Sequence, residues 1–397
     1  MSERPVILFG AFDRHNFGDL LLAQVAARQL SGRTLLFAGL AQRDLRADGG
    51  FASDLLAARA ATWPAADLVH VGGEILGCSA YEAAVMLLDT EQFPSMIGQV
   101  DREPLVRRSW TSAFLGSERE LPYLLGKRDF PAAVNIVCQA IGGVDFTSLP
   151  EAAKFEAISA LHSADVVSVR DEVTQKNLAA VGVGSILVPD PAVLVAHLFS
   201  DEVARQVEQG EVANLRRLYP QGFLAVQCSA DFGDDDTLNA LARQLDALAS
   251  QTGRGIVLFR AGLAPWHDEL AVYRRLRGVM SASAVSLFSS SHLWDICALL
   301  SVADAFVGSS LHGRIVAEAF GKPALNLLGS PSGSGKLQAY DKTWSPPGSS
   351  RVVAMADVAE NLICRLAELP GRRTEWQAEL VDRATRAGLD RLSLSHR

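Results

Sequence analysis

Several features are scarce in this sequence, and each absence argues against a class of protein. The chain has 397 residues but only five cysteines, which are odd in number, lie far apart and form no CxxC pair. This spacing fits neither a disulfide framework nor a zinc site. No apolar run has the length of a membrane span, and the first apolar run is too short for a signal peptide. We therefore expect a cytoplasmic protein without an integral membrane segment.

Positive charge is also scarce. The formal net charge is −8, with 37 Lys and Arg against 45 Asp and Glu. Nucleic-acid binding depends on Lys and Arg that neutralise phosphates, so no nucleic-acid partner is expected. A local basic pocket for a small anion is compatible with this balance. With 49% hydrophobic residues, the chain has ample material for buried cores.

The chain reads as two α/β halves. Short apolar runs alternate with amphipathic stretches, which is typical of parallel βαβ units, and the continuous hydrophobicity of the strands predicts helices on both faces of each sheet. The predicted strands are Val6–Phe9, Thr34–Ala38, Leu68–Val71, Asn135–Ala140, Val166–Val169, Ile186–Val188, Phe223–Gln227, Gly255–Phe259, Val285–Phe288, Ala305–Val307 and Ala324–Leu327. Predicted helices include Leu20–Leu30, Thr237–Ser250 and Ile315–Phe320.

This pattern predicts two domains. We expect Rossmann-like domains at residues 1–205 and 206–397, divided inside the charged stretch Leu198–Leu218, with a C-terminal surface helix after Pro370. Such domains usually bind ligands in the cleft at the carboxyl ends of their strands. The predicted fold class is therefore α/β, with two Rossmann-like domains facing a cleft in a GT-B-like arrangement.

Two motifs follow strands of the first half. Asn16, Gly18 and Asp19 lie where the first strand joins the first helix, and we expect Asp19 to cap that helix. Exposed amides of such a helix start can hold an anion or a sugar hydroxyl; the alternative is a simple capped turn. Gly72 and Gly73 allow close approach of a ligand or another backbone, and Glu74 can accept a hydrogen bond from a substrate hydroxyl; the alternative is a tight loop with a solvated Glu.

Arg170, in the third motif, is an unexpected residue at the end of a strand. It follows the predicted strand Val166–Val169 and precedes a helix, whose positive end disfavours a cation. This placement is a mild indication of function. The alternative is an Arg paired with Asp171 or a neighbouring acid. Downstream, Asp190 and Pro191 end a further strand as a turn.

The strongest motif lies in the second half. Gly308, Ser309, Ser310, Leu311, His312, Gly313 and Arg314 stand where a predicted strand opens into a helix. Amides, hydroxyls and two potentially cationic side chains in such a place suit a phosphate or carboxylate. A lone His at a helix start is more often structural, but this clustering favours a functional role.

Two other segments resemble binding motifs without matching them. Residues 330–337 look like a P-loop, but Ser330 replaces the first Gly and Leu337 the required Ser or Thr, and we expect no helical context. Lys336 remains a candidate cation for the ligand. The acidic run Asp231–Asp236 lacks calcium-loop spacing and is expected to be a helix start. No metal site is therefore expected.

Taken in order, these motifs resemble the polysaccharide pyruvyl transferase family. The matching pieces are NFGD from Asn16, the glycines 72–73, SVRDEVTQKNL around Arg170, DP at 190–191, and VGSSLHGRIVAEAFGKPALNL around His312, with Lys336 placed similarly to a lysine of the family. The resemblance spans residues 6 to about 340. Ser310 departs from it, because many members carry Arg there; the segment 79–130 is an insert for acceptor specificity or for structure alone.

The resemblance implies a transfer of the enolpyruvyl group from phosphoenolpyruvate to a sugar diol, which forms a cyclic pyruvate ketal without a cofactor or metal. It implies His312 as the catalytic acid or base, since imidazole suits proton transfer near neutral pH. It implies a donor side in the C-terminal domain and an acceptor side in the N-terminal domain. The donor-binding candidates are Arg170, Ser309, Ser310, Gly313, Arg314 and Lys336. The acceptor-binding candidates are Asn16, Asp19, Gly72, Gly73 and Glu74.

The expected partners are this donor and a glycan or lipid-linked sugar acceptor, with peripheral membrane contact compatible. Two alternatives stay open at this point. One is a GT-B glycosyltransferase that uses a nucleotide sugar. The other is a catalytically silent relative that binds glycan or protein, for which Ser310 is the best argument and His312 the main obstacle.

Overall fold

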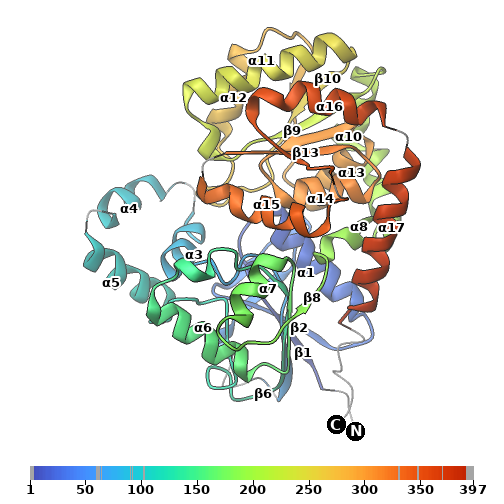
Figure 1. Ribbon diagram of the computed structural model, residues 1–397. Helices are drawn as coiled ribbons and strands as arrows, with labels where there is room; N and C mark the ends of the chain where they lie inside the picture. The colour runs from blue at the N-terminus through green and yellow to red at the C-terminus, as the bar shows by residue number, and fades with distance from the viewer. Residues whose placement is uncertain are drawn as a thin grey trace. The chain divides into compact units, whose positions relative to one another are not determined.

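A computed structural model shows two α/β units, each built on a sheet of mostly parallel strands (Figure 1). It describes residues 4–59, 63, 65–89, 91, 93–101, 103–329, 331–346, 348–368 and 370–389, with the backbone alone at 331–334 and 370–374. Unit 1 comprises the chain up to Pro191 and again from Arg383 onward, whereas unit 2 spans Ala192–Asp382. The division thus falls before the predicted stretch Leu198–Leu218, because the helices of that stretch pack within unit 2.

The sheet of unit 1 has the order β3-β4-β2-β1-β5-β6-β7-β8, and every pairing is parallel except β3 with β4. Its strands are β1 (Val6–Phe9), β2 (Leu35–Gly39), β3 (Arg43–Asp44), β4 (Ala52–Leu55), β5 (Ala66–His70), β6 (Ala133–Ile141), β7 (Val166–Val169) and β8 (Ile186–Leu187). Its helices are α1 (Phe17–Gln29), α2 (Leu56–Arg59), α3 (Ala80–Met86), α4 (Phe93–Val100), α5 (Pro104–Leu115), α6 (Glu151–Ser163) and α7 (Glu172–Ala179).

The sheet of unit 2 has the order β11-β10-β9-β12-β13-β14, with parallel pairings throughout. Its strands are β9 (Phe223–Gln227), β10 (Gly255–Leu258), β11 (Val285–Leu287), β12 (Ala305–Gly308), β13 (Ala324–Leu327) and β14 (Val352–Val353). Its helices are α8 (Val195–Leu198), α9 (Ser200–Val207), α10 (Gly210–Leu218), α11 (Asp235–Thr252), α12 (Leu270–Val279), α13 (Leu293–Val302), α14 (Leu311–Ala319), α15 (Pro331–Trp344), α16 (Val358–Ala367) and α17 (Pro370–Arg386), the last of which ends beyond the unit.

These bounds confirm every predicted strand within two residues and add three short ones, β3, β4 and β14. These three strands are two to four residues long and only partly buried. They therefore have no continuous apolar run from which the sequence could predict them. The acidic run at 231–236 does lead into a helix, because Asp234 caps α11 by accepting a hydrogen bond from Thr237 N. The predicted helix after Pro370 is α17.

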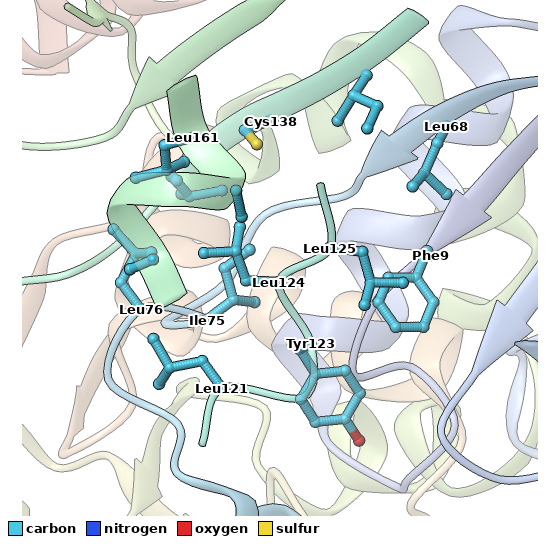
Figure 2. Close-up of a cluster of buried hydrophobic side chains, with 14 of the residues drawn as sticks. Phe9, Leu68, Ile75, Leu76, Leu121, Tyr123, Leu124, Leu125, Cys138 and Leu161 are labelled. Atoms are coloured by element: carbon cyan, nitrogen blue, oxygen red, sulfur yellow. The ribbon is translucent and has the colours of Figure 1, made fainter. Parts of the chain in front are cut away.

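Each unit has its own apolar core. In unit 2, α11 buries Leu238, Leu241, Ala242, Leu245 and Leu248, a helical spacing that lays one face on the sheet. In unit 1, the core takes in side chains from the insert 79–130, and Figure 2 shows Tyr123 and Leu125 beside Phe9 of β1, with Leu121 and Leu124 in the same cluster. The end of the insert is therefore an integral part of the domain. Four cysteines are buried and Cys364 is exposed, and all five are free thiols, as the sequence predicts.

Candidate functional site

Both sheets reverse their strand order at one place. In unit 1 this switch point lies between β1 and β5, and in unit 2 between β9 and β12. In doubly wound folds, ligands bind beyond the carboxyl ends of the two strands that flank such a point. The motif loops predicted from sequence follow β1 and β5 in unit 1 and β12 in unit 2. The topology therefore places them where each unit, taken by itself, would hold a ligand.

The loop after β1 begins α1 at Phe17, three residues earlier than predicted. Asn16 caps the helix, since its Oδ1 accepts hydrogen bonds from Gly18 N (2.9 Å) and Asp19 N (3.2 Å). Asp19 is thus a residue of the first turn and not the predicted cap. Its carboxylate lies 3.7 Å from Arg14 and faces Gly73, where an added Cβ would stand 3.1 Å from Asp19 Oδ1. Asn16, Asp19 and Gly73 therefore lie close together.

The glycine pair after β5 is required by its backbone. Gly72 and Gly73 have φ angles of 99° and 84°, in the left-handed region that favours glycine. A side chain at Gly72 would also meet Gln139 O at 2.9 Å. The close approach predicted for these glycines is thus confirmed for another strand of the protein's own backbone; an approach by a ligand stays a prediction.

Glu74 and Arg170, predicted for acceptor and donor, bind each other. Arg170 Nη2 lies 2.5 Å from Glu74 Oε2, and Nη1 lies 3.2 Å from Asp190 Oδ2. Arg170 is only 2% exposed, and Asp190 is fully buried. Burial acts to lower the pKa of Arg170, but Glu74, Asp190 and Asp171 outweigh it and raise that pKa. The guanidinium is thus charged and compensated within the protein.

In this geometry the charge of Arg170 is met by acids of the protein itself, and direct binding of the donor by Arg170 stays a prediction. Its neighbour Asp171 caps α7 by accepting hydrogen bonds from Thr174, while Arg170 forms ion pairs with Glu74 and Asp190. The alternative of an Arg paired with a neighbouring acid therefore describes the site. Glu74 also accepts a hydrogen bond from Val144 N, which ties the loop after β5 to the loop after β6.

In unit 2, uncharged groups hold the turn between β12 and α14. Ser310 caps α14, since its Oγ accepts from Gly313 N (3.0 Å). Gln227, at the end of β9, accepts from Ser310 N (2.9 Å) and from Ser309 Oγ (3.2 Å). Asn326 in β13 donates to the carbonyls of Gly308 and Ser310, both at 2.9 Å. The serines predicted to bind a donor are thus primarily parts of this frame.

His312 stands in the first turn of α14, half-buried, at the carboxyl edge of the sheet. The positive end of the helix dipole lies at this turn, and no acidic residue stands in it to offset the field. An anion placed there would interact favourably with the helix and with His312. This is the arrangement that the sequence predicts for a phosphate or carboxylate, although the ligand itself is a prediction.

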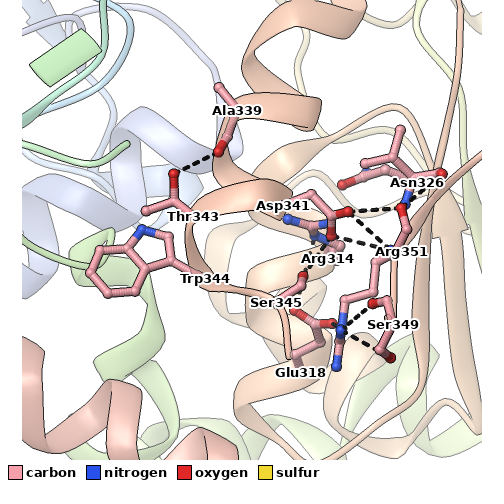
Figure 3. A network of polar contacts seen from close by, with 12 residues as sticks. Arg314, Glu318, Asn326, Ala339, Asp341, Thr343, Trp344, Ser345, Ser349 and Arg351 are labelled. Carbon is pink, nitrogen blue, oxygen red and sulfur yellow. Dashed lines mark hydrogen bonds and ion pairs between the residues drawn. The ribbon is translucent and has the colours of Figure 1, made fainter. Parts of the chain in front are cut away.

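Arg314 lies in the interior of unit 2 instead of at the site. It is 1% exposed, lies 2.9 Å from Asp341 Oδ1 and 4.0 Å from Glu318 Oε2, and stacks near Tyr340. Figure 3 shows it in a network that also holds Arg351. Its helical position explains the outcome, since Arg314 faces inward one turn before Glu318. Donor binding by Arg314 stays a prediction, but its burial and ion pairs give it a structural role in unit 2.

Lys336 is an exposed residue of α15. The P-loop-like segment from Pro331 belongs to this helix, which corrects the expectation that it lacks helical context; Ser330 lies outside the described residues. A P-loop wraps phosphate before its helix begins, so a segment that is itself helical does not fit that motif. Lys336 remains a candidate donor-binding cation.

Sequence reasoning missed several residues that shape these sites. Gln227 and Asn326 look like ordinary polar residues within strands, although Gln227 closes a predicted strand and so carried a weak signal. Asp268 lies in a loop with no motif, yet it is buried and receives both hydrogen bonds from the Gln227 amide. Asp13, almost fully buried, joins the loop after β1 to the insert by accepting from Tyr123 Oη (2.7 Å).

Neither a metal centre nor a membrane span is found in the part of the chain that the structure describes. No group of three or more His, Cys, Asp or Glu side chains there is placed to hold a metal ion. None of the described helices is both long and apolar enough to cross a membrane.

Comparison of the whole fold finds solved structures of similar architecture. A UDP-GlcNAc 2-epimerase from Neisseria meningitidis, solved with UDP-GlcNAc, aligns over 98% of this chain and 99% of its own, with 12% identity and a TM-score of 0.51. A trehalose-6-phosphate synthase from Burkholderia multivorans aligns over 99% and 94%, with 11% identity and a TM-score of 0.47. At 12% identity, the likeness to the epimerase concerns the fold alone, which is GT-B-like. No curated protein sequence matches the chain significantly.

Sequence comparison with protein families is more specific. Residues 16–331 match the polysaccharide pyruvyl transferase family. The matched segment begins at the cap of α1 and includes Gly72, Arg170 and the His312 turn, so it contains the switch-point loops of both units. With most of its length matched, the chain belongs to the polysaccharide pyruvyl transferase family.

Proposed function

We propose that this transferase moves the enolpyruvyl group of phosphoenolpyruvate onto a sugar diol. A proton adds to the methylene carbon of the donor, and one sugar hydroxyl adds at C2. The second hydroxyl then displaces phosphate from C2, which gives a cyclic pyruvate ketal and inorganic phosphate. The residues support a donor that carries both a phosphate and a carboxylate.

The observation that carries this proposal is the position of His312. It stands at the positive end of α14, beside the switch point of unit 2 and inside the matched family segment. In that position an imidazole can transfer a proton to the methylene carbon or donate a hydrogen bond to the phosphate. The donor set we propose comprises His312, Gly313, Ser309, Ser310 and Lys336.

The acceptor set we propose lies in unit 1. Asn16, Asp19, Gly72 and Gly73 offer a carboxylate, an amide and close backbone to sugar hydroxyls. Glu74 and Arg170 form an ion pair with each other, so we propose that they position the loop of this set and do not bind the acceptor directly.

The biological setting is part of the proposal. Phosphoenolpyruvate is a metabolite of the cytoplasm, so we propose that the reaction takes place there. The acceptor would be a polysaccharide or its lipid-linked precursor, in the biosynthesis of exopolysaccharide or another cell-envelope glycan. A lipid-linked acceptor would bring the enzyme into peripheral contact with the membrane. No cofactor or metal is required for this chemistry.

The test is phosphate release from phosphoenolpyruvate with a panel of sugar diols. We expect His312→Asn to lower turnover roughly 10²–10⁴-fold if His312 acts as acid or base. If it only binds phosphate, the KM for the donor should change more than turnover. His162→Asn, on an exposed position of α6, is the matched control and should behave like the parent. Full turnover in a folded His312→Asn protein would contradict the catalytic assignment.

A second candidate is a silent relative that binds glycan without catalysis. It is favoured by the burial of Arg314, because that residue cannot supply the cation that many family members carry at the position of Ser310. A parent protein that neither binds phosphoenolpyruvate nor releases phosphate with any acceptor, but binds a glycan, would establish this reading.

A further inference from the structure

Asp268 lies beneath the turn that begins α14, in the loop after β10. It is buried, and its carboxylate accepts four hydrogen bonds. Gln227 Nε2 donates to Oδ1 (2.8 Å) and Oδ2 (3.0 Å), whereas Ala261 N (2.6 Å) and Tyr273 Oη (3.1 Å) donate to Oδ2. Each of these partners is therefore a donor, and Oδ1 faces Gln227.

This contact decides which way the Gln227 amide points. With Nε2 turned to Asp268, Oε1 is turned to the β12–α14 junction, where it accepts from Ser309 Oγ and Ser310 N. A flipped amide would set its oxygen against a carboxylate and its NH₂ against the Ser310 N–H. While Asp268 is ionised, both contacts would be repulsive, so its carboxylate selects one orientation.

The backbones of β9 and β12 are closely packed at the β12–α14 junction. A Cβ on Gly308 would stand 2.5 Å from Gln227 O and 3.0 Å from Gln227 Oε1. The loop after β10 is also joined to the loop after β9, because Ala230 N donates to His267 O (2.8 Å). Ser229 N donates to Ser309 Oγ (3.0 Å), so the loops after β9, β10 and β12 form one hydrogen-bonded unit.

We propose that Asp268 is a positioning residue of the donor site, which acts through Gln227 to hold the Ser309–Ser310 turn and hence the start of α14 with His312. This inference rests on the proposed function, in which α14 binds the donor. Asp268 itself does not touch the donor. Its effect is on where the amides and the imidazole of the first turn stand.

The variant Asp268→Asn tests this with little change of size. Because Oδ2 meets three donors, the substituted side chain will place its oxygen there and its NH₂ toward Gln227 Nε2. That donor–donor contact favours the flipped Gln227, which releases Ser310 N. We expect the KM for phosphoenolpyruvate to rise about tenfold, the loss of roughly one hydrogen bond, with a smaller change in kcat.

Gln227→Glu supplies a second, independent readout. Two facing carboxyls can share one proton at low pH, which keeps the contact, but they repel when both are ionised. The groups that face this pair are Tyr273, Cys228 and Arg260, of which only Arg260 is cationic. We therefore expect the donor KM of Gln227→Glu to be near that of the parent at pH 6 and to rise steeply by pH 8. A merely structural residue would not produce this profile.

Tyr273→Phe is the matched control. It removes the hydrogen bond from Tyr273 to the same carboxylate and the one that Tyr273 Oη accepts from Cys228 N (3.1 Å), but it leaves the contact between Gln227 and Asp268 intact. It should therefore lower stability and change the donor KM much less than Asp268→Asn. An active parent whose Asp268→Asn and Gln227→Glu variants keep its donor KM and pH profile overturns the positioning role alone. An inactive parent that does not bind phosphoenolpyruvate overturns this role together with the proposed function. If Asp268→Asn does not fold, the Gln227→Glu profile decides.

Discussion

The two switch points of this protein are held by opposite kinds of chemistry. In unit 1, charges meet charges, since Arg170 is clamped between Glu74 and Asp190. In unit 2, uncharged Gln227, Asn326 and the two serines hold the turn before α14. Neutral hydrogen bonds fix a backbone without cancelling the field of the helix behind it. The difference supports our proposal that the anionic donor binds in unit 2, because the charge of Arg170 is already met by Glu74 and Asp190.

The largest expected effect comes from breaking the charged clamp. Arg170→Met leaves Glu74 and Asp190 without their cation, and loss of one partner from a buried ion pair costs about 3–5 kcal/mol. We expect a loss of that order in the free energy of unfolding by urea, with little change in donor affinity for the remaining folded protein. Arg108→Met, which removes an exposed Arg near Glu120, should change stability by less than about 1 kcal/mol. A stable Arg170→Met protein with weakened donor binding would return Arg170 to the donor site.

A smaller effect is expected from breaking the neutral frame. Asn326→Ala removes the side-chain donors to the carbonyls of Gly308 and Ser310, and leaving such buried groups unsatisfied costs about 1–3 kcal/mol. Unlike Arg170→Met, this change should also raise the donor KM. Asn361→Ala, which removes an exposed side-chain hydrogen bond to Asp357 O, is the control for the amide chemistry. An Asn326→Ala protein with parental donor KM would show that the frame and the donor site are independent.

The smallest effect is a dependence of stability on pH. Burial raises the pKa of Asp268 from 3.8 to about 7, against the opposing effect of its hydrogen bonds. The native state therefore keeps a proton that the unfolded chain has lost, so this contribution to stability is complete below about pH 4 and disappears as the pH rises through 7. Between pH 6 and 8 it should remove about 1 kcal/mol from the parent relative to Asp268→Asn. Parallel pH profiles of the two proteins would contradict this.

Most of the fold could be predicted from the sequence because its strands are buried on both faces. Runs such as Val6–Phe9 and Phe223–Gln227 are fully buried and continuously apolar, and a period or run of that kind is a local signal. The positions of the motif loops could also be predicted from local signals. Glycines and capping residues mark the strand ends, and topology then brings those ends to one edge of each sheet.

The partners of the motif residues could not be read in the same way. Arg170 and Glu74 are 96 residues apart, and no local sequence pattern near either residue predicts that they form an ion pair. Arg314 looked like a site cation because it is two residues from His312, yet helical geometry turns the two side chains to different surroundings. Asp268 and Gln227 meet only through the register of β9 with β10. Long-range pairing, and not residue type, thus separates the structural charges from the candidate ligands.

One measurement tests the central claim most directly: calorimetric titration of the parent protein with phosphoenolpyruvate and, separately, with UDP-N-acetylglucosamine. A pyruvyl transferase whose donor site is framed by neutral groups at the positive end of α14 should bind phosphoenolpyruvate, and Asn326→Ala should weaken that binding. It should show no binding of the nucleotide sugar at the same concentrations. Saturable binding of the nucleotide sugar without binding of phosphoenolpyruvate would contradict the account and make the protein a GT-B glycosyltransferase in its donor chemistry.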